Sequence, residues 1–233
     1  MKNLIYIFLL TSIFLFNSCK ESVIQPTDEL LGYDYFPTKI GKYIIYNVRE
    51  IYHDDAVDLH DTSYYKIKEV ITSEFTDETG RICQRIERFI KDKTVNDTIF
   101  EIKDVWTACL TLNNLEQIEE NFKYVKLVFP LKEGVSWDGN VYNTQDKWEY
   151  EIQNLGESYT VNGTNYSETA TVLQYIEKNF VKDDYSVEVY AKNIGMIYKE
   201  KKLLVLDSDS QSANYGKVST GYEIKMEAIS YSN

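Results

Sequence analysis

Short runs of β-forming residues separated by polar turns recur along most of the chain, and this pattern constrains the fold more than any other feature. Clear examples lie at residues 43–52, 64–75 and 124–129. Tyrosine, valine, isoleucine and threonine suit a pleated surface with one wetted face, and the chain has 20 tyrosines against 3 prolines. No stretch after residue 18 sustains a long amphipathic helical period. The sequence therefore predicts a mostly β protein with few short helices.

The second half of the chain indicates how the strands are connected. Further β-rich runs lie at 148–152, 159–161, 169–178, 185–192, 196–206 and 222–231. Asn162 and Gly163, between two of these runs, form a tight hairpin signal. We expect a single large antiparallel sheet, curved or partly closed into a half-barrel or barrel-like meander. Because there is no mid-chain linker or internal repeat, residues 33–233 are predicted to form a single β-rich domain.

Two stretches are harder to assign. Residues 81–91 place isoleucine and phenylalanine at helical spacing, but the charged residues between them also permit an alternating strand, which we favour. The polar stretch 53–62 is expected to form the loop that joins the first two strands.

The N-terminal segment has the three-part layout of a secretory signal. Lys2 supplies the positive charge, residues 4–16 form an apolar run too short to span a bilayer comfortably, and a small residue precedes Cys19. This ending resembles the lipobox of bacterial lipoproteins. The resemblance implies that residues 1–18 are a signal peptide, that Cys19 carries the acyl (palmitate-type) anchor, and that residues 19–32 are the lipidated N-terminus and tether. An ordinary signal with an incidental cysteine and an uncleaved anchor are the alternatives.

The net charge of −12 limits the possible partners. So acidic a surface repels phosphate backbones, which makes nucleic acid a poor partner, and it is also repelled by anionic membrane surfaces. Attachment to a membrane therefore needs the acyl anchor rather than a basic patch. We expect an outer-membrane lipoprotein, at the periplasmic face or at the cell surface.

Cys83 and Cys109 remain after processing. In an oxidising compartment they could form one disulfide, but sequence spacing does not show that they meet, and two buried thiols fit equally well. A catalytic thiol needs a histidine partner, and the chain has only His53 and His60. We therefore do not expect cysteine catalysis.

Four segments resemble a recurring family of uncharacterised Bacteroidetes lipoproteins. They are YFPTKIGKY at 35–43, VKLVFP at 125–130, SWDGN at 136–140 and EVYAKNIGMIYKE at 188–200. The resemblance spans most of the mature chain and implies an envelope location and a β fold, but it carries no catalytic residues to transfer. A vaguer architectural likeness is to curved-sheet lipoprotein carriers, whose concave face holds lipid.

The densest group of metal-capable side chains lies between residues 53 and 61. His53, His60 and Asp55 are the candidate metal ligands, because imidazole and carboxylate together suit zinc or another transition metal. The alternative is a solvated polar loop, since the spacing matches no established site.

Aromatic residues supply the candidate ligand contacts. Trp137, with turn residues around it, is the first choice, followed by Trp106 and Trp148; packing within the sheet is the alternative. Thr98, within an Asp-Thr-Ile sequence, resembles the sites at which Bacteroidetes attach O-glycans.

No phosphate-binding loop, nucleophile elbow or cofactor motif is found in the sequence. We expect a non-enzymatic, lipid-anchored binding or assembly module of the cell envelope, without a cofactor, that holds an apolar or glycan ligand or another envelope protein. A glycan-acting hydrolase with paired carboxylates and a purely structural envelope protein are the alternatives.

Overall fold

The computed structural model describes residues 27–92 and 99–232, and every strand in these ranges belongs to one 12-stranded antiparallel sheet. The strands are β1 (Tyr43–Asp54), β2 (Leu59–Thr76), β3 (Ile82–Asp92), β4 (Glu101–Leu110), β5 (Asn114–Glu119), β6 (Phe122–Val128), β7 (Ser136–Asp138), β8 (Glu149–Val161), β9 (Thr164–Lys178), β10 (Asp183–Ala191), β11 (Gly195–Leu206) and β12 (Val218–Tyr231). Within the described ranges, no helix has the length and apolar character needed to cross a membrane.

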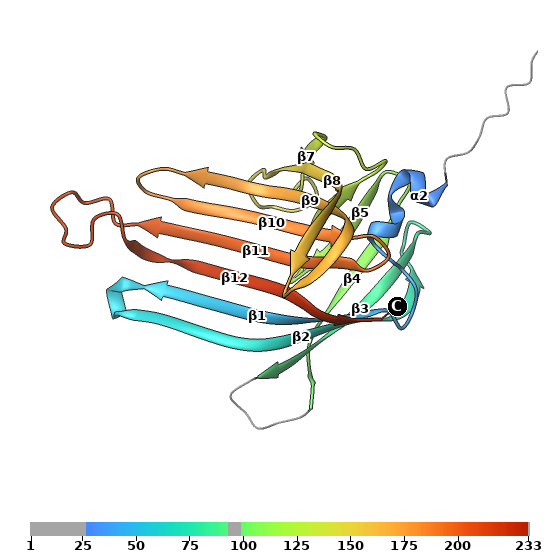
Figure 1. The fold of residues 1–233 in the computed structure, drawn as a ribbon, viewed down its shortest axis with the longest axis horizontal. Helices are drawn as coiled ribbons and strands as arrows, with labels where there is room; N and C mark the ends of the chain where they lie inside the picture. Colours follow the sequence, from blue (N-terminus) through green and yellow to red (C-terminus); the bar gives the residue numbers. More distant parts are fainter. Residues whose placement is uncertain (1–26, 93–98, 233) are drawn as a thin grey trace, which may run out of the picture.

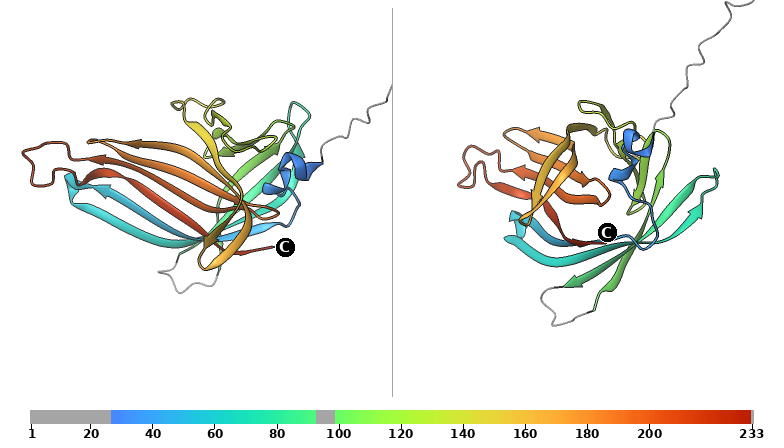
Figure 2. Two further views of the ribbon diagram at one scale, coloured as in Figure 1. Left: turned by 45° about the horizontal axis from the view of Figure 1, so that its top comes forward. Right: turned by 45° about the vertical axis from the view of Figure 1, so that its right-hand side comes forward.

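The sheet curves into a nearly closed barrel shape, and its strand order places strands that are consecutive in the chain at the two edges. The order is β6-β5-β4-β3-β2-β1-β12-β11-β10-β9-β8-β7, so the first and last strands pair in the middle of the sheet. The two edge strands, β6 and β7, are consecutive in the chain, and the curvature brings them toward each other (Figures 1 and 2). The predicted mostly β fold with one curved, partly closed antiparallel sheet is confirmed.

The SWDGN segment brings the two edges together. The Val125 backbone N–H of β6 donates to the Gly139 carbonyl at 2.9 Å, and the Trp137 indole Nε1–H of β7 donates to the Val125 carbonyl at 2.8 Å. A Cβ at position 139 would lie 2.4 Å from the ring of Tyr150, so this contact requires glycine. The segment therefore has a structural role in closing the sheet.

The β8–β9 hairpin folds back over the outer face of β10 to β12, where it crosses the longer strands in Figure 1. Its tip is formed by Asn162 and Gly163, both at positive φ (48° and 78°), as the sequence predicts. Tyr159 packs on Tyr198 with ring centroids 5.6 Å apart, and the Asn162 side-chain amide donates to the Ala228 carbonyl. Because of this cover, β10 is buried on both of its faces.

A short N-terminal segment covers one end of the sheet. It consists of α2 (Asp28–Leu31) and η2 (Tyr33–Tyr35), at the right of Figure 1. The ring of Tyr33 packs edge-on against Phe129 at 4.8 Å, and its hydroxyl donates to the Leu112 carbonyl. The last residues of the stretch predicted as a tether therefore form a helical turn docked on the domain, while residues 19–26 lie outside the described ranges.

Two differences from the sequence prediction affect the candidate sites. The stretch 53–62 is not a loop, because β1 continues to Asp54 and β2 begins at Leu59, so His53 and His60 are directly opposed on paired strands. Strand β5 was not predicted, because its sequence NLEQIE is largely polar. Residues 82–92 form strand β3, in agreement with the favoured assignment.

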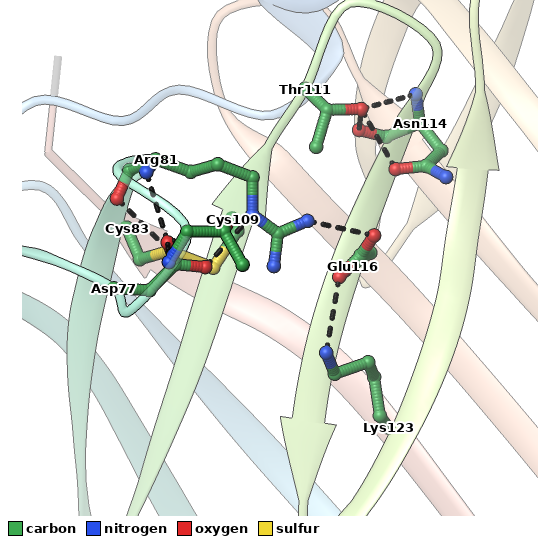
Figure 3. Close-up of a disulfide and its surroundings, with 9 residues drawn as sticks. Asp77, Arg81, Cys83, Cys109, Thr111, Asn114, Glu116 and Lys123 are labelled. Carbon is green, nitrogen blue, oxygen red and sulfur yellow. Dashed lines mark hydrogen bonds and ion pairs between the residues drawn. A yellow bond between two sulfur atoms is a disulfide. The ribbon is translucent and has the colours of Figure 1, made fainter. Parts of the chain in front are cut away.

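Cys83 and Cys109 form a disulfide between β3 and β4, which settles the alternative that the sequence left open (Figure 3). Arg81 lies next to it and joins Asp77 to Glu116, with Nε–Oδ2 and Nη1–Oε1 distances of 2.8 and 3.0 Å. The bridge and the ion pairs together tie the turn after β2 to β4 and β5.

We expect the Cys83→Ala/Cys109→Ala variant to unfold at lower urea concentration than the wild type. The bridge closes a loop with a sequence separation of 26 residues, and removing such a cross-link costs about 3 kcal/mol through the entropy of the unfolded chain. Urea unfolding followed by circular dichroism measures the loss, and reduced wild type is the control. Equal midpoints for oxidised wild type and variant would contradict the expected stabilisation.

Candidate functional site

The interior of the curved sheet contains a cluster of four charged side chains. Lys126 Nζ lies 2.6 Å from Glu188 Oε1 and 2.9 Å from Glu119 Oε1. Lys199 Nζ lies 3.0 Å from Glu188 Oε1 and 3.6 Å from Glu119 Oε2. Glu188 is 0% exposed, and its second oxygen accepts a 2.6 Å hydrogen bond from the Tyr190 hydroxyl. The two positive and two negative charges balance, as buried ions require.

The cluster holds all four groups ionised. Burial alone would raise the pKa of Glu188, but the ammonium groups of Lys126 and Lys199 outweigh it and hold that pKa well below its ordinary value. Burial alone would lower the pKa of Lys126, but the carboxylates of Glu119 and Glu188 outweigh it and raise that pKa. The pKa of Lys199 is raised and that of Glu119 lowered by the same balance.

A second charged group lies beside the first. Arg88 on β3 places Nε 2.9 Å from Glu69 Oε1 and Nη1 3.0 Å from Asp104 Oδ2. Its guanidinium also stacks over the indole of Trp106, 3.6 Å from the ring centroid. Burial raises the pKa of Glu69, and Arg88 offsets only part of that rise.

Two cavities adjoin these groups along the axis of the sheet. The smaller has a volume of about 70 Å³ and lies toward the end covered by η2, where Phe36, Tyr46 and Met196 contribute to its wall. The larger has a volume of about 390 Å³ and lies farther along the strands, where Glu50, Tyr65 and Tyr222 contribute to its wall. Residues that border both are Trp106, Glu119, Lys199 and Met226. Glu119 and Lys199 of the ion-pair cluster therefore lie between two cavities, and the volume of the larger one is that of a ligand site.

Lys201 differs from the other interior cations. It follows Lys199 by two positions on β11, so both point to the same face, and it borders the larger cavity. Its ammonium lies 5.1 Å from the ring centroid of Trp148, but it has no ion-pair partner in the part of the chain that the structure describes. Burial, together with repulsion from Lys199, lowers its pKa. The Lys201 ammonium is therefore suited to bind an anion in the larger cavity.

The three candidate tryptophans have different surroundings. Trp106 borders both cavities, and its indole N–H is buried without a hydrogen-bond acceptor among the described residues. Trp148 stacks on Tyr175, with ring centroids 4.6 Å apart. Trp137 donates its N–H to a backbone carbonyl at the closure of the sheet. Only Trp106 of the three thus combines a cavity wall with an unused donor in the described structure.

The predicted metal ligands come together at the β1–β2 hairpin. His53 Nδ1 and His60 Nδ1 face each other at 3.0 Å. His53 Nε2 lies 3.0 Å from Glu223 Oε1, and His60 Nε2 lies 3.1 Å from Asp55 Oδ1. Asp55 therefore contacts one of the two histidines, and Glu223, which sequence reasoning missed, contacts the other.

A second group of side chains of the types that bind metals lies at the disulfide, where the cysteines are not available as thiolate ligands. Asp77, Cys83 and Cys109 lie within 4.8 Å of one another, but the two sulfur atoms are bonded to each other. The predicted lipidation site Cys19 and O-glycosylation site Thr98 lie outside the described residues.

Comparison with known proteins gives structural similarities alone. No protein-family model and no curated protein matches the chain. A crystal structure from Bacteroides fragilis, described as an exported protein with a YmcC-like fold, is similar with a TM-score of 0.44 and 12% identity, over 85% of this chain and 98% of that chain. A structure from Parabacteroides distasonis, described as a lipoprotein, is similar with a TM-score of 0.37 and 10% identity, over 84% and 98%. The resemblance of the four sequence segments to Bacteroidetes lipoproteins stays a prediction.

We expect Lys126→Met to destabilise the fold by about 3–5 kcal/mol, because it leaves two buried carboxylates with Lys199 as their nearest cation. The double variant Lys126→Met/Glu188→Gln keeps the cluster electrically balanced and should recover much of the loss. Urea unfolding measures both. The matched control is Lys182→Met, which removes a surface pair with Glu177 and should leave the midpoint nearly unchanged. A wild-type midpoint for Lys126→Met would show that the cluster contributes nothing to stability.

Proposed function

We propose that this protein is a lipid-anchored, non-enzymatic binding module of the bacterial envelope that holds an amphipathic ligand with an anionic group inside its curved sheet. The observation that carries the proposal is the cavity of about 390 Å³, whose wall includes Lys201, a lysine without an ion-pair partner among the described residues. Pockets for small ligands have volumes of about 300–1,000 Å³, so the cavity has the size of a ligand site.

The wall of the larger cavity suits a ligand that is apolar at one end and charged at the other. Its apolar and aromatic members are Tyr65, Ile67, Ile90, Trp106, Tyr124, Tyr222, Ile224 and Met226. Within this wall, Arg88, Lys103 and Lys199 are already ion-paired. Among the described residues, Lys201 is therefore the cation left for a carboxylate, phosphate or sulfate of the ligand. The unpaired N–H of Trp106 offers one further donor.

The cavity also contains negative groups, which restrict where the anion of the ligand can lie. Glu50 on β1 and Lys201 on β11 both flank Ile224 of β12, so their backbones are about 10 Å apart, twice the spacing of adjacent strands. The Tyr65 hydroxyl donates to Glu50 at 2.9 Å, which satisfies that carboxylate without a cation. The anionic end of a ligand therefore belongs on the β11 side.

A glycan hydrolase is less well supported. Glu69, whose pKa is raised, and Glu119, whose pKa is lowered, border the same cavity. A general acid and a general base need pKa values that differ in this way. However, that cavity has a volume of about 70 Å³, well below the range of pockets that hold ligands. Both carboxylates are also ion-paired, Glu69 with Arg88 and Glu119 with Lys126.

The anchor can be tested directly. We expect the Cys19→Ala variant, expressed in its own host, to move from the membrane fraction to the soluble envelope fraction, because an acidic surface is repelled by anionic membranes and does not replace an acyl anchor. Immunoblots of both fractions and incorporation of labelled palmitate provide the measurement. Retention of the variant in membranes would contradict lipid anchoring.

The ligand site can be tested with a matched pair of fluorescent probes, anionic anilinonaphthalene sulfonate and uncharged phenylnaphthylamine. We expect Lys201→Met to weaken binding of the anionic probe by about tenfold or more, the worth of one charge-assisted hydrogen bond, and to leave the uncharged probe unaffected. Lys202→Met is the control, because Lys202 lies on the opposite face of β11 and pairs with Asp183 at 2.8 Å.

A blocking variant tests the cavity independently of the charge. Ile224→Trp should exclude both probes, whereas Ile229→Trp, at a more exposed position of the same strand, should exclude neither. If wild type binds neither probe, or Ile224→Trp binds both normally, the cavity is not a ligand site. Native mass spectrometry of the protein purified from its own envelope then identifies the bound molecule.

A further inference from the structure

The histidine pair at the β1–β2 hairpin is separate from the interior cavity. His53 and His60 are directly opposed in the register of the two strands. His53 is an odd number of positions from Glu50, which borders the interior cavity, so alternation along β1 places His53 on the outer face. The side chain of His53 is 13% exposed and that of His60 is 48% exposed, so solvent reaches the pair from one side.

The hydrogen bonds of the pair decide where the ring protons lie. An ionised carboxylate only accepts, so Glu223 requires a proton on His53 Nε2 and Asp55 requires one on His60 Nε2. A neutral imidazole has one N–H, which leaves both Nδ1 atoms as bare acceptors. These two acceptors face each other at 3.0 Å. Two lone pairs in that position repel each other unless a metal ion or a proton lies between them.

We propose that His53 and His60 bind one divalent transition-metal ion, of the zinc or copper type, through their Nδ1 atoms. Metal-bound histidines almost always donate the other ring N–H to a carboxylate or carbonyl, and both histidines here do so. Imidazole nitrogen favours zinc, copper and nickel over calcium and magnesium, which prefer oxygen ligands.

The distance between the two Nδ1 atoms needs little adjustment to accommodate such an ion. Two nitrogens at about 2.05 Å from a tetrahedral metal lie about 3.4 Å apart, so the two Nδ1 atoms, now at 3.0 Å, must separate by a few tenths of an ångström. The exposed side of His60 admits water to the remaining coordination positions. Asp55 and Glu223 compensate part of the ionic charge and fix the orientation of the two rings.

Isothermal titration calorimetry of the mature chain with zinc chloride, and electron paramagnetic resonance with copper(II), test the site. We expect one ion per chain and a copper spectrum with coupling to two nitrogens. His53→Ala and His60→Ala should each abolish specific binding. Glu223→Gln should weaken it about tenfold to a hundredfold, which is the usual effect of losing a hydrogen-bonded carboxylate behind a metal-bound histidine.

Asp61→Asn is the matched control, because it removes one negative charge from the same hairpin and leaves both imidazole–carboxylate hydrogen bonds in place. It should bind zinc as the wild type does. Zinc binding that survives His60→Ala, or that falls equally in Asp61→Asn and Glu223→Gln, would overturn the site. Absence of zinc and copper binding in the wild type would overturn it as well. The probe experiments on Lys201 are unaffected by either result.

Discussion

The buried ion-pair cluster of Glu119, Lys126, Glu188 and Lys199 is the constraint on which the rest of the structure depends. Its members come from β5 and β6 on one side of the sheet and from β10 and β11 on the other. A flat sheet would leave these charges far apart, and each would then need water. Because their side chains are at most 14% exposed and pair with one another, the sheet must curve until the two groups of strands face each other. The short contacts of the SWDGN segment complete the closure.

Much of the fold was predictable from local pattern. The β-rich runs, the Asn162–Gly163 turn and the strand at residues 82–92 each follow from propensity, turn chemistry or alternation. Strand β5 escaped prediction because its polar residues outnumber its apolar ones, and the ion pairs of Glu116 and Glu119 that allow them to lie in a sheet are evident only in three dimensions. Residues 53–62 form largely the ends of β1 and β2 rather than the expected loop, because polar residues on an outward strand face resemble a loop in composition.

The interior site could not have been found in the same way. In β10, Val187, Glu188 and Val189 alternate, which ordinarily indicates apolar residues inside and a charged residue outside. Here the valines lie under the folded-back β8–β9 hairpin and Glu188 points inward, so the alternation is inverted. That inversion depends on tertiary packing. For the same reason, Lys201 looks like an ordinary surface lysine in the sequence. Its place in the cavity wall, without an ion-pair partner among the described residues, is evident only in three dimensions.

The two ends of the curved sheet differ, because α2 and η2 cover only one of them. The described chain begins at Thr27 beside α2. The larger cavity lies on the far side of the ion-pair cluster from that end. With an acyl chain on Cys19, the intervening stretch could reach at most about 30 Å even when fully extended. The end of the sheet covered by α2 and η2 would then lie close to the bilayer, and the end with the larger cavity would face the aqueous compartment.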